Sequence, residues 1–277
     1  MTIQGEARGR TVSETVVDAK RRRRTQANGL VDPSWKTLYV IGGVALLVEG
    51  LAYLMITAMG PMMGVPPGNT LAWLNALAAH PKLALFDYGI VTGIADLVLI
   101  PAAFALYFAL KGVSKSWMLV AAGMILIYVA VDVATFVSTS IDLTWLTQNY
   151  AAATDATARA AILGAEYSAL STIPLSQFLG WTFPPFAFLI VAVAVREARF
   201  ARGVPLLGYF TVLFSVAGGI SFLDPVAYWQ NFQLPALAVY GLFMLGLGSM
   251  LIRLGRGAPR NATARTEWQE PRTGGSP

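Results

Sequence analysis

The chain has 277 residues, of which 56% are hydrophobic and 13% are charged, with a mean hydropathy of +0.58 and a formal net charge of +5. A soluble domain carries about 25% charged residues, so this composition excludes a water-exposed globular protein and a disordered chain. The sequence contains no cysteine, which excludes a disulfide scaffold and a thiol-dependent enzyme. Composition therefore predicts an integral membrane protein.

Six apolar runs are long enough to cross a hydrocarbon core of about 30 Å, which takes about 20 helical residues. We interpret the first as a retained signal anchor, because it is too long for a signal peptide and no cleavage site follows it. The expected fold class is all-α, a polytopic six-transmembrane-helix bundle at 35–253 between flexible tails at 1–34 and 254–277. In chain order the runs are 38–59, 88–110, 117–139, 171–195, 206–223 and 234–252.

Lysine and arginine positions predict the orientation of these spans. Segments 1–36, 111–115, 196–202 and 253–272 together hold 18 of the 20 basic residues. Because cytoplasmic loops are enriched in Lys and Arg, we expect a multi-pass protein of the cell membrane with both termini in the cytoplasm.

A basic tract lies upstream of the first span. We expect it to set topology and to attract anionic lipid headgroups, at about 1 kcal/mol per cation, and we do not expect nucleic acid as a partner. A protein partner or a homo-oligomer is left open. The tract consists of Lys20, Arg21, Arg22, Arg23 and Arg24.

Three carboxyl groups lie inside the first three predicted spans: Glu49, Asp96 and Asp132. At 1.5 Å per residue they lie about 17, 21 and 23 Å from the cytoplasmic ends, so they share one depth. Charge at this depth costs a few kcal/mol and needs a reason. No Lys, Arg or His lies in any predicted span, so the acids cannot be simple ion pairs. They form either a proton or cation site, or protonated packing groups that hydrogen-bond between helices.

Desolvation and a neighbouring carboxylate both disfavour the ionised form of a carboxyl group. We therefore expect at least one of the three acids to be neutral at pH 7 if they converge. A neutral acid can pass a proton on, or it can only donate a hydrogen bond. Both interpretations of the acids survive this argument.

The fourth predicted span contains Pro184 and Pro185, with Gln177 and Thr182 in its outer half. Prolines remove backbone donors, so this helix is expected to kink or open. One interpretation is a broken helix whose freed carbonyls lie beside the acids, as in transporter ion sites. The other is an ordinary proline kink, which membrane helices tolerate.

A long outer connector is expected at 141–170. Within it, an Ala-rich stretch begins after Thr154 or Asp155, which is a helix start signal. We expect a short helix there, lying on the outer surface or extending the fourth span.

Glycines in the spans predict close helix contacts within the fold. Gly89 and Gly93 form a small-xxx-small face in the second span. The same role is expected for Gly42, Gly43, Gly218, Gly219, Gly246 and Gly248.

No usual metal or cofactor site is expected, because the chain has no cysteine and no histidine in a span. His80, the single histidine, is more simply a helix cap or loop contact than a metal ligand.

Four short segments carry a resemblance: LNALAAHP at 74–81, YGI at 88–90, ALYFALKGVS at 105–114 and VPLLG at 204–208. They resemble a bacterial domain-of-unknown-function family of six-helix integral membrane proteins. In that family an outer Asn-Ile-x-x-His-Pro-like segment precedes a helix ending in Ala-Leu-Tyr-x-Leu-Leu, and Pro-x-x-Leu-Gly opens the fifth span. The resemblance implies six helices in a bacterial inner membrane, and it carries over no activity and no catalytic residue.

The leading functional hypothesis is a small, transporter-like, proton- or cation-coupled membrane protein that uses Glu49, Asp96 and Asp132 as its ion path. The alternative is a non-catalytic membrane subunit or assembly protein in which the acids are packing groups. An intramembrane aspartyl protease is disfavoured, because the segments before Asp96 and Asp132 lack the Gly-x-Gly-Asp and Tyr-Asp motifs. No catalytic residue is assigned.

Overall fold

The computed structural model describes residues 32–63, 92–171, 173–201, 203–220 and 232–257. These residues form helices and no strand, which confirms the all-α class. After the 3-10 turn η1 (Pro33–Trp35), the helices are α2 (Lys36–Met63), α5 (Thr92–Leu110), α6 (Lys115–Ala152), α7 (Ala156–Ser171), α8 (Ile173–Ala198), α9 (Val204–Ile220) and α11 (Gln233–Gly257).

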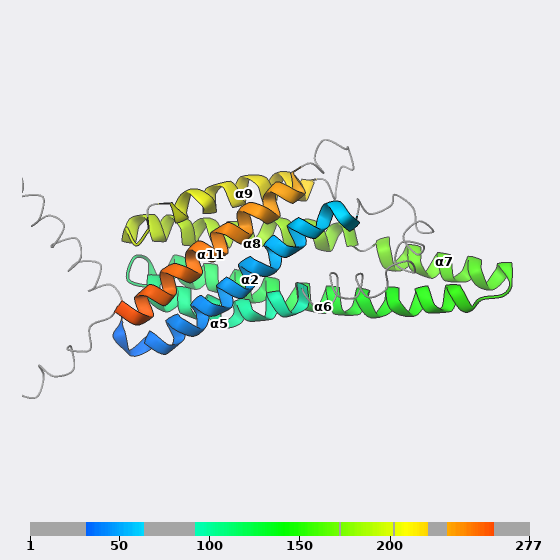
Figure 1. Cartoon of the computed structure of the whole chain (residues 1–277), viewed down its shortest axis with the longest axis horizontal. Helices are drawn as coiled ribbons and strands as arrows, with labels where there is room; N and C mark the ends of the chain where they lie inside the picture. Colours follow the sequence, from blue (N-terminus) through cyan, green and yellow to red (C-terminus); the bar gives the residue numbers. More distant parts are fainter. Residues whose placement is uncertain (1–31, 64–91, 172, 202, 221–231, 258–277) are drawn as a thin grey trace, which may run out of the picture.

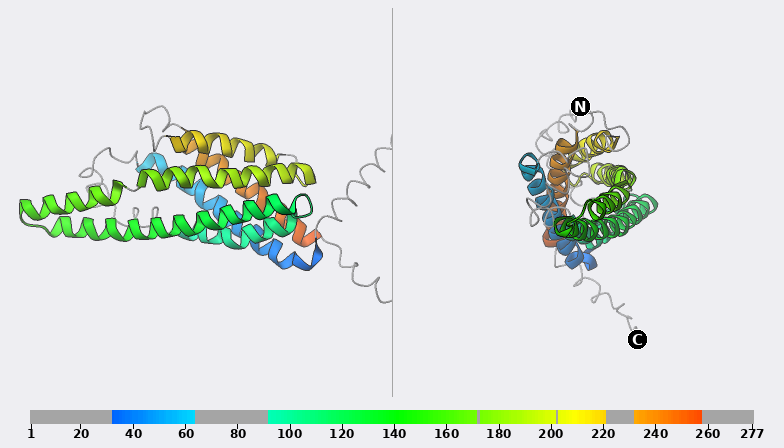
Figure 2. Two further views of the ribbon diagram at one scale, coloured as in Figure 1. Left: turned by 180° about the vertical axis from the view of Figure 1, so that it is seen from behind. Right: turned by 90° about the vertical axis from the view of Figure 1, so that its right-hand side faces the viewer.

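Six of the helices pack as a closed ring. Around the ring, α2 packs on α5, α5 on α6, α6 on α8, α8 on α9, α9 on α11, and α11 back on α2. Figure 1 shows them running side by side, and the end-on view of Figure 2 shows their arrangement around a common axis. The inside of the ring holds the hydrophobic core, to which Leu46, Leu106, Phe188 and Phe243 contribute fully buried side chains.

The outside of the ring is apolar, as expected for a protein surrounded by lipid. Large hydrophobic side chains are exposed on every helix of the ring, among them Leu51, Phe104, Leu119, Phe186 and Leu213. A soluble protein does not expose so extended an apolar surface. Four segments are long and apolar enough to cross a membrane, and two shorter apolar helices accompany them. The four are Pro33–Ala58, Lys115–Thr135, Gly180–Ala198 and Gln233–Gly257, and the shorter two are Ala95–Leu110 and Val204–Ile220.

Helix α6 is longer than predicted. It has 38 residues, which at 1.5 Å each is about 57 Å and exceeds a hydrocarbon core of about 30 Å. The expected connector at 141–170 is therefore wrong in its first part, because the helix continues to Ala152. Its far end and α7 form a hairpin that projects beyond the other helices (Figures 1 and 2).

The short helix expected after Thr154 or Asp155 is confirmed as α7. The Asp155 carboxylate accepts a hydrogen bond from the Ala158 N–H at 2.8 Å, so Asp155 caps the first turn. Helix α7 runs back along α6, and α8 begins at Ile173, two residues after the end of α7.

Glycines allow α2 and α11 to approach to backbone contact. A Cβ atom at Gly50 would lie 2.7 Å from the Gly241 carbonyl oxygen, and one at Gly248 would lie 2.6 Å from the Gly43 oxygen. Seven residues separate the glycines on each helix, which is close to two turns and keeps them on one face. The two helices are antiparallel, so each step along α2 matches a step back along α11. We call these four residues the glycine seam.

The six glycines predicted to make close contacts outside the Gly89–Gly93 face all do so. Besides the seam residues, Gly42 lies against Ala105, Gly218 and Gly219 lie against Trp181, and Gly246 lies against Val204. The close contact predicted at Gly93 is not found among the described residues, where a Cβ atom would meet no atom within 4 Å, and Gly89 lies outside those residues.

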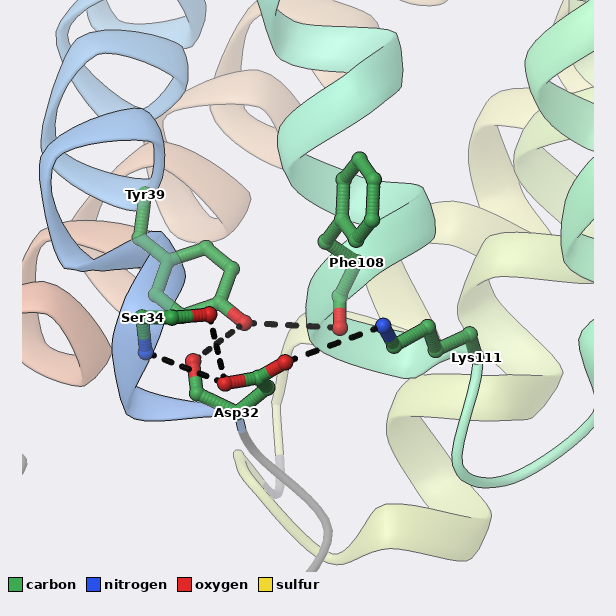
Figure 3. Close-up of polar contacts among 5 residues, drawn as sticks. All are labelled: Asp32, Ser34, Tyr39, Phe108 and Lys111. Atoms are coloured by element: carbon green, nitrogen blue, oxygen red, sulfur yellow. Dashed lines mark hydrogen bonds and ion pairs between the residues drawn. The ribbon is translucent and has the colours of Figure 1, made fainter.

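Polar contacts tie the start of α2 to the end of α5 (Figure 3). Asp32 accepts hydrogen bonds from the Ser34 hydroxyl at 2.7 Å and the Ser34 N–H at 3.0 Å, and its second oxygen lies 4.0 Å from the Lys111 ammonium. The Ser34 donors hold the pKa of the Asp32 carboxyl below its usual range, and Lys111 lowers that pKa further. The Tyr39 hydroxyl lies 3.1 Å from the Asp32 carbonyl oxygen and 3.4 Å from that of Phe108. These contacts fix the entry of the chain into α2.

Candidate functional site

The structure brings Glu49, Asp96 and Asp132 together inside the ring. They come from α2, α5 and α6, which are three successive helices around it. Glu49 and Asp96 have no exposed surface, and Asp132 is 8% exposed. Three neighbouring helices thus place their acids at one level on their inner faces.

Asp96 is the centre of this cluster. Its Oδ1 accepts hydrogen bonds from the Tyr128 hydroxyl at 3.1 Å and from the Tyr53 hydroxyl at 3.4 Å. The Asp132 carboxyl lies close enough to interact with both the Asp96 carboxyl and the Tyr128 hydroxyl. Tyr128 and Asp132 lie four residues apart on α6, and both lie beside Gly180 of α8.

Glu49 is held by a different tyrosine. The Tyr240 hydroxyl, on α11, donates to Glu49 Oε1 at 2.8 Å. The Tyr240 ring packs edge-on against the Tyr53 ring with centroids 4.7 Å apart, and against Phe188 at 5.6 Å. The Tyr240 and Tyr53 rings thus connect the Glu49 part of the cluster to the Asp96 part.

Each acid keeps one oxygen without a hydrogen-bond partner. These atoms are Glu49 Oε2, Asp96 Oδ2 and Asp132 Oδ2, and all three are buried. Among the described residues, no Lys, Arg or His forms an ion pair with any of the acids. A buried carboxylate oxygen without a donor is costly, so these positions call for a proton or another positive group.

The described residues do not form a metal site at the cluster. No three His, Cys, Asp or Glu side chains among them are arranged to hold a metal ion. The acids interact as an aspartate pair with a separate glutamate, and tyrosine hydroxyls supply the remaining polar groups.

Helix α8 reaches the cluster through a glycine. A Cβ atom at Gly180 would lie 3.4 Å from Asp132 Oδ1 and 3.7 Å from the Tyr128 ring, so the missing side chain leaves room for both. Pro184, four residues later, has no N–H to donate to the Gly180 carbonyl. Despite Pro184 and Pro185, both buried, α8 is helical from Ile173 to Ala198. Helix α8 therefore does not open at the prolines, which rules out the broken-helix interpretation and leaves the ordinary proline kink.

The other two residues predicted on α8 have different positions. The Thr182 hydroxyl donates to the carbonyl of Phe178 in its own helix at 2.7 Å, and the Thr182 methyl group lies beside Gly219 of α9. The side chain of Gln177 lies outside the described residues. The contact of α8 with the acids is thus made by Gly180, which the sequence did not single out.

The three tyrosines were also missed by the sequence analysis. Two of them carried a signal, because Tyr53 follows Glu49 by four residues and Tyr128 precedes Asp132 by four, which places each pair on one helix face. Tyr240 had no such signal, since it lies 191 residues from Glu49 in the chain.

Comparison with protein-family models, curated proteins and solved structures finds no match to the chain. The resemblance to a bacterial family of six-helix membrane proteins stays a prediction. The function is therefore argued from the geometry of the cluster.

Proposed function

We propose that the protein is a proton-coupled, transporter-like membrane protein and that Glu49, Asp96 and Asp132 carry its proton path. The observation that supports this most directly is that each of these buried acids has an oxygen with no hydrogen-bond partner. Ionisable groups inside a membrane are costly and mark ion pathways and proton relays.

A proton fits the cluster better than a metal ion. A metal ion needs several ligands around one point, and the described residues offer no such group. A proton needs only one acceptor and a neighbour that can take it over. Carboxyl and tyrosine hydroxyl groups on α2, α5, α6 and α11 provide such neighbours.

We further propose six spans, with α5 and α9 as the second and fifth, in a bacterial inner membrane. The α5–α6 and α8–α9 connections, the start of α2 and the end of α11 lie at one end of the bundle (Figure 1). Basic residues lie at these positions, including Lys36, Lys111, Lys115, Arg196 and Arg253. The positive-inside rule then places this end, both termini and the Lys20 to Arg24 tract at the cytoplasmic surface, where anionic headgroups would meet them.

Single cysteines test this orientation cleanly, because the natural chain has none. Ser116→Cys lies exposed at the start of α6, and Thr157→Cys lies exposed on the projecting hairpin. A membrane-impermeant maleimide added to intact cells is expected to label Thr157→Cys at once and Ser116→Cys only after permeabilisation. Labelling of both sites in intact cells, or the reverse order, would contradict the proposed topology.

Proton coupling is tested with the full chain reconstituted into vesicles that contain a pH-sensitive dye. We expect that at least one solute from a panel of organic cations, amino acids and sugars changes the internal pH. Asp96→Asn and Asp132→Asn are expected to abolish this signal, because an amide cannot release a proton in this range. Asp142→Asn is the matched control, since Asp142 is an exposed acid on the same helix as Asp132.

The alternative function is a non-catalytic membrane subunit in which the acids only hold helices together. One observation favours it: the three tyrosine hydrogen bonds of the cluster each join two helices, α2 to α11, α2 to α5 and α5 to α6. This alternative predicts that the amide variants change stability in detergent and leave vesicle pH unaffected by any solute. It also predicts a protein partner that co-purifies with the full chain and is lost when residues 1–30 are removed.

A further inference from the structure

We infer that Asp96 and Asp132 bind one proton between them and that the Tyr128 hydroxyl repositions to replace it when it leaves. This inference deepens the proposed function, on which it rests for its role in transport, by assigning the proton to two of the three acids. Tyr128 is then a positioning residue for the proton.

The hydrogen bonds of the two aspartates leave one acceptor on each that a shared proton can satisfy. Asp96 Oδ1 already accepts from two hydroxyls, those of Tyr53 and Tyr128. Asp96 Oδ2 and Asp132 Oδ2 are buried and have no partner, although the two carboxyls interact. A proton bound to one carboxyl makes it a donor, and the other carboxyl, which interacts with it, is the acceptor within reach.

Among the described residues that contact the two aspartates, only a protonated carboxyl is left to supply that donor. Helix α2 presents Glu49 and Tyr53 to Asp96, and Tyr53 already donates to Asp96 Oδ1. Helix α11 presents Tyr240, whose hydroxyl donates to Glu49. Helix α8 presents Gly180, which has no side chain. Among the described residues, no basic group takes part.

Release of the proton follows from the same geometry. The O–H bond at the aspartate pair breaks, its electron pair stays on the carboxylate oxygen, and the proton passes to water or to a basic group of the solute. Two carboxylates then face each other. Because Tyr128 lies against both aspartates, its hydroxyl can turn from Asp96 to Asp132. Each carboxylate then has one tyrosine donor, Tyr53 for Asp96 and Tyr128 for Asp132.

Glu49 does not share this proton. Its Oε1 accepts from Tyr240 at 2.8 Å, and its interaction with Asp132 is one between charges, whereas Asp96 and Asp132 are within hydrogen-bonding reach of each other. Glu49 therefore lies outside the pair of aspartates that binds this proton.

Infrared spectroscopy of the full chain in lipid nanodiscs tests the inference. At neutral pH we expect a carbonyl-stretch band of a protonated carboxylic acid that shifts in heavy water and disappears at alkaline pH. Asp96→Asn and Asp132→Asn are each expected to reduce this band to the part that belongs to Glu49, which Glu49→Gln removes, whereas Asp142→Asn leaves the band unchanged. Tyr128→Phe is expected to keep the band and to move its disappearance to higher pH, because one carboxylate then has no tyrosine donor.

The inference is overturned if the wild-type protein lacks this band at neutral pH, if Asp132→Asn leaves the band unchanged, or if Tyr128→Phe leaves its pH dependence unchanged. If one asparagine variant fails to fold, the wild-type and Tyr128→Phe spectra still test whether the aspartates bind a proton next to Tyr128. The vesicle assay distinguishes this result from the proposed function. If the band is present and no solute moves protons, the shared proton is supported and transport is rejected. If a solute moves protons and the band is absent, transport is supported and the shared proton is rejected.

Discussion

Replacing Gly248 by alanine is expected to destabilise the protein by about 2 kcal/mol. The new Cβ atom would lie 2.6 Å from the carbonyl oxygen of Gly43. A carbonyl in a helix cannot rotate away, so α2 and α11 must separate and the contacts along the seam loosen. Overpacking of this kind costs about 1–3 kcal/mol, and the clash with backbone favours the upper end. Better helix propensity of alanine offsets up to about 1 kcal/mol.

The same substitution at an open glycine provides the control. A Cβ atom at Gly123, within α6, would meet no atom within 4 Å. Gly123→Ala is therefore expected to leave stability unchanged or to raise it by up to about 1 kcal/mol. Both variants are compared by reversible unfolding in mixed micelles, followed by far-UV circular dichroism. Equal stability of Gly248→Ala and Gly123→Ala would show that the seam does not hold α2 against α11.

The seam also shows how far the sequence predicts the packing. Gly43 and Gly248 could be recognised as small residues in apolar helices, and both lie at close contacts as expected. Their partners could not be predicted, because α2 and α11 are at opposite ends of the chain. The seven-residue spacing on both helices becomes meaningful only once the antiparallel pair is known.

The cluster was predictable in its acids and not in its tyrosines. Depth alone placed Glu49, Asp96 and Asp132 at one level, since helical rise converts residue number directly into distance. Which way each residue faces depends on helix rotation, and a run that is apolar on all sides gives no information about rotation. Tyrosine is also common at membrane interfaces, so a tyrosine within a span did not stand out as a partner for an acid.

The unbroken helices α6 and α8 have separate physical causes. The segment after Thr139 is polar enough to suggest a connector, yet it continues as helix to Ala152 because α7 packs along it. In α8, buried Pro184 and Pro185 remove two backbone donors, yet the chain remains helical because its neighbours α6 and α9 hold it on both sides. In each case tertiary packing outweighs the local sequence signal.

Tyr240→Phe is the second substitution with a large expected effect. It removes the hydroxyl that donates to Glu49 Oε1 at 2.8 Å, while Glu49 Oε2 already has no partner. A fully buried carboxyl group would then have no donor among the described residues. Leaving a buried acceptor unsatisfied costs about 1–3 kcal/mol, and more when the group is charged. Tyr209→Phe on α9 is the control, and a change within about 0.5 kcal/mol is expected there.

A double-mutant cycle with Glu49→Leu separates the hydrogen bond from the packing of the ring. Glu49→Leu alone leaves the Tyr240 hydroxyl buried without its acceptor. Tyr240→Phe with Glu49→Leu removes both polar partners, and replacing both by apolar groups can be nearly neutral. We therefore expect the double variant to be more stable than Tyr240→Phe alone, with a coupling energy of about 1–3 kcal/mol. If the two single losses simply add, Glu49 and Tyr240 are not coupled in the folded protein. If coupling is found and Glu49→Leu still moves protons with solute in the vesicle assay, Glu49 is a packing group and the proton path consists of the two aspartates.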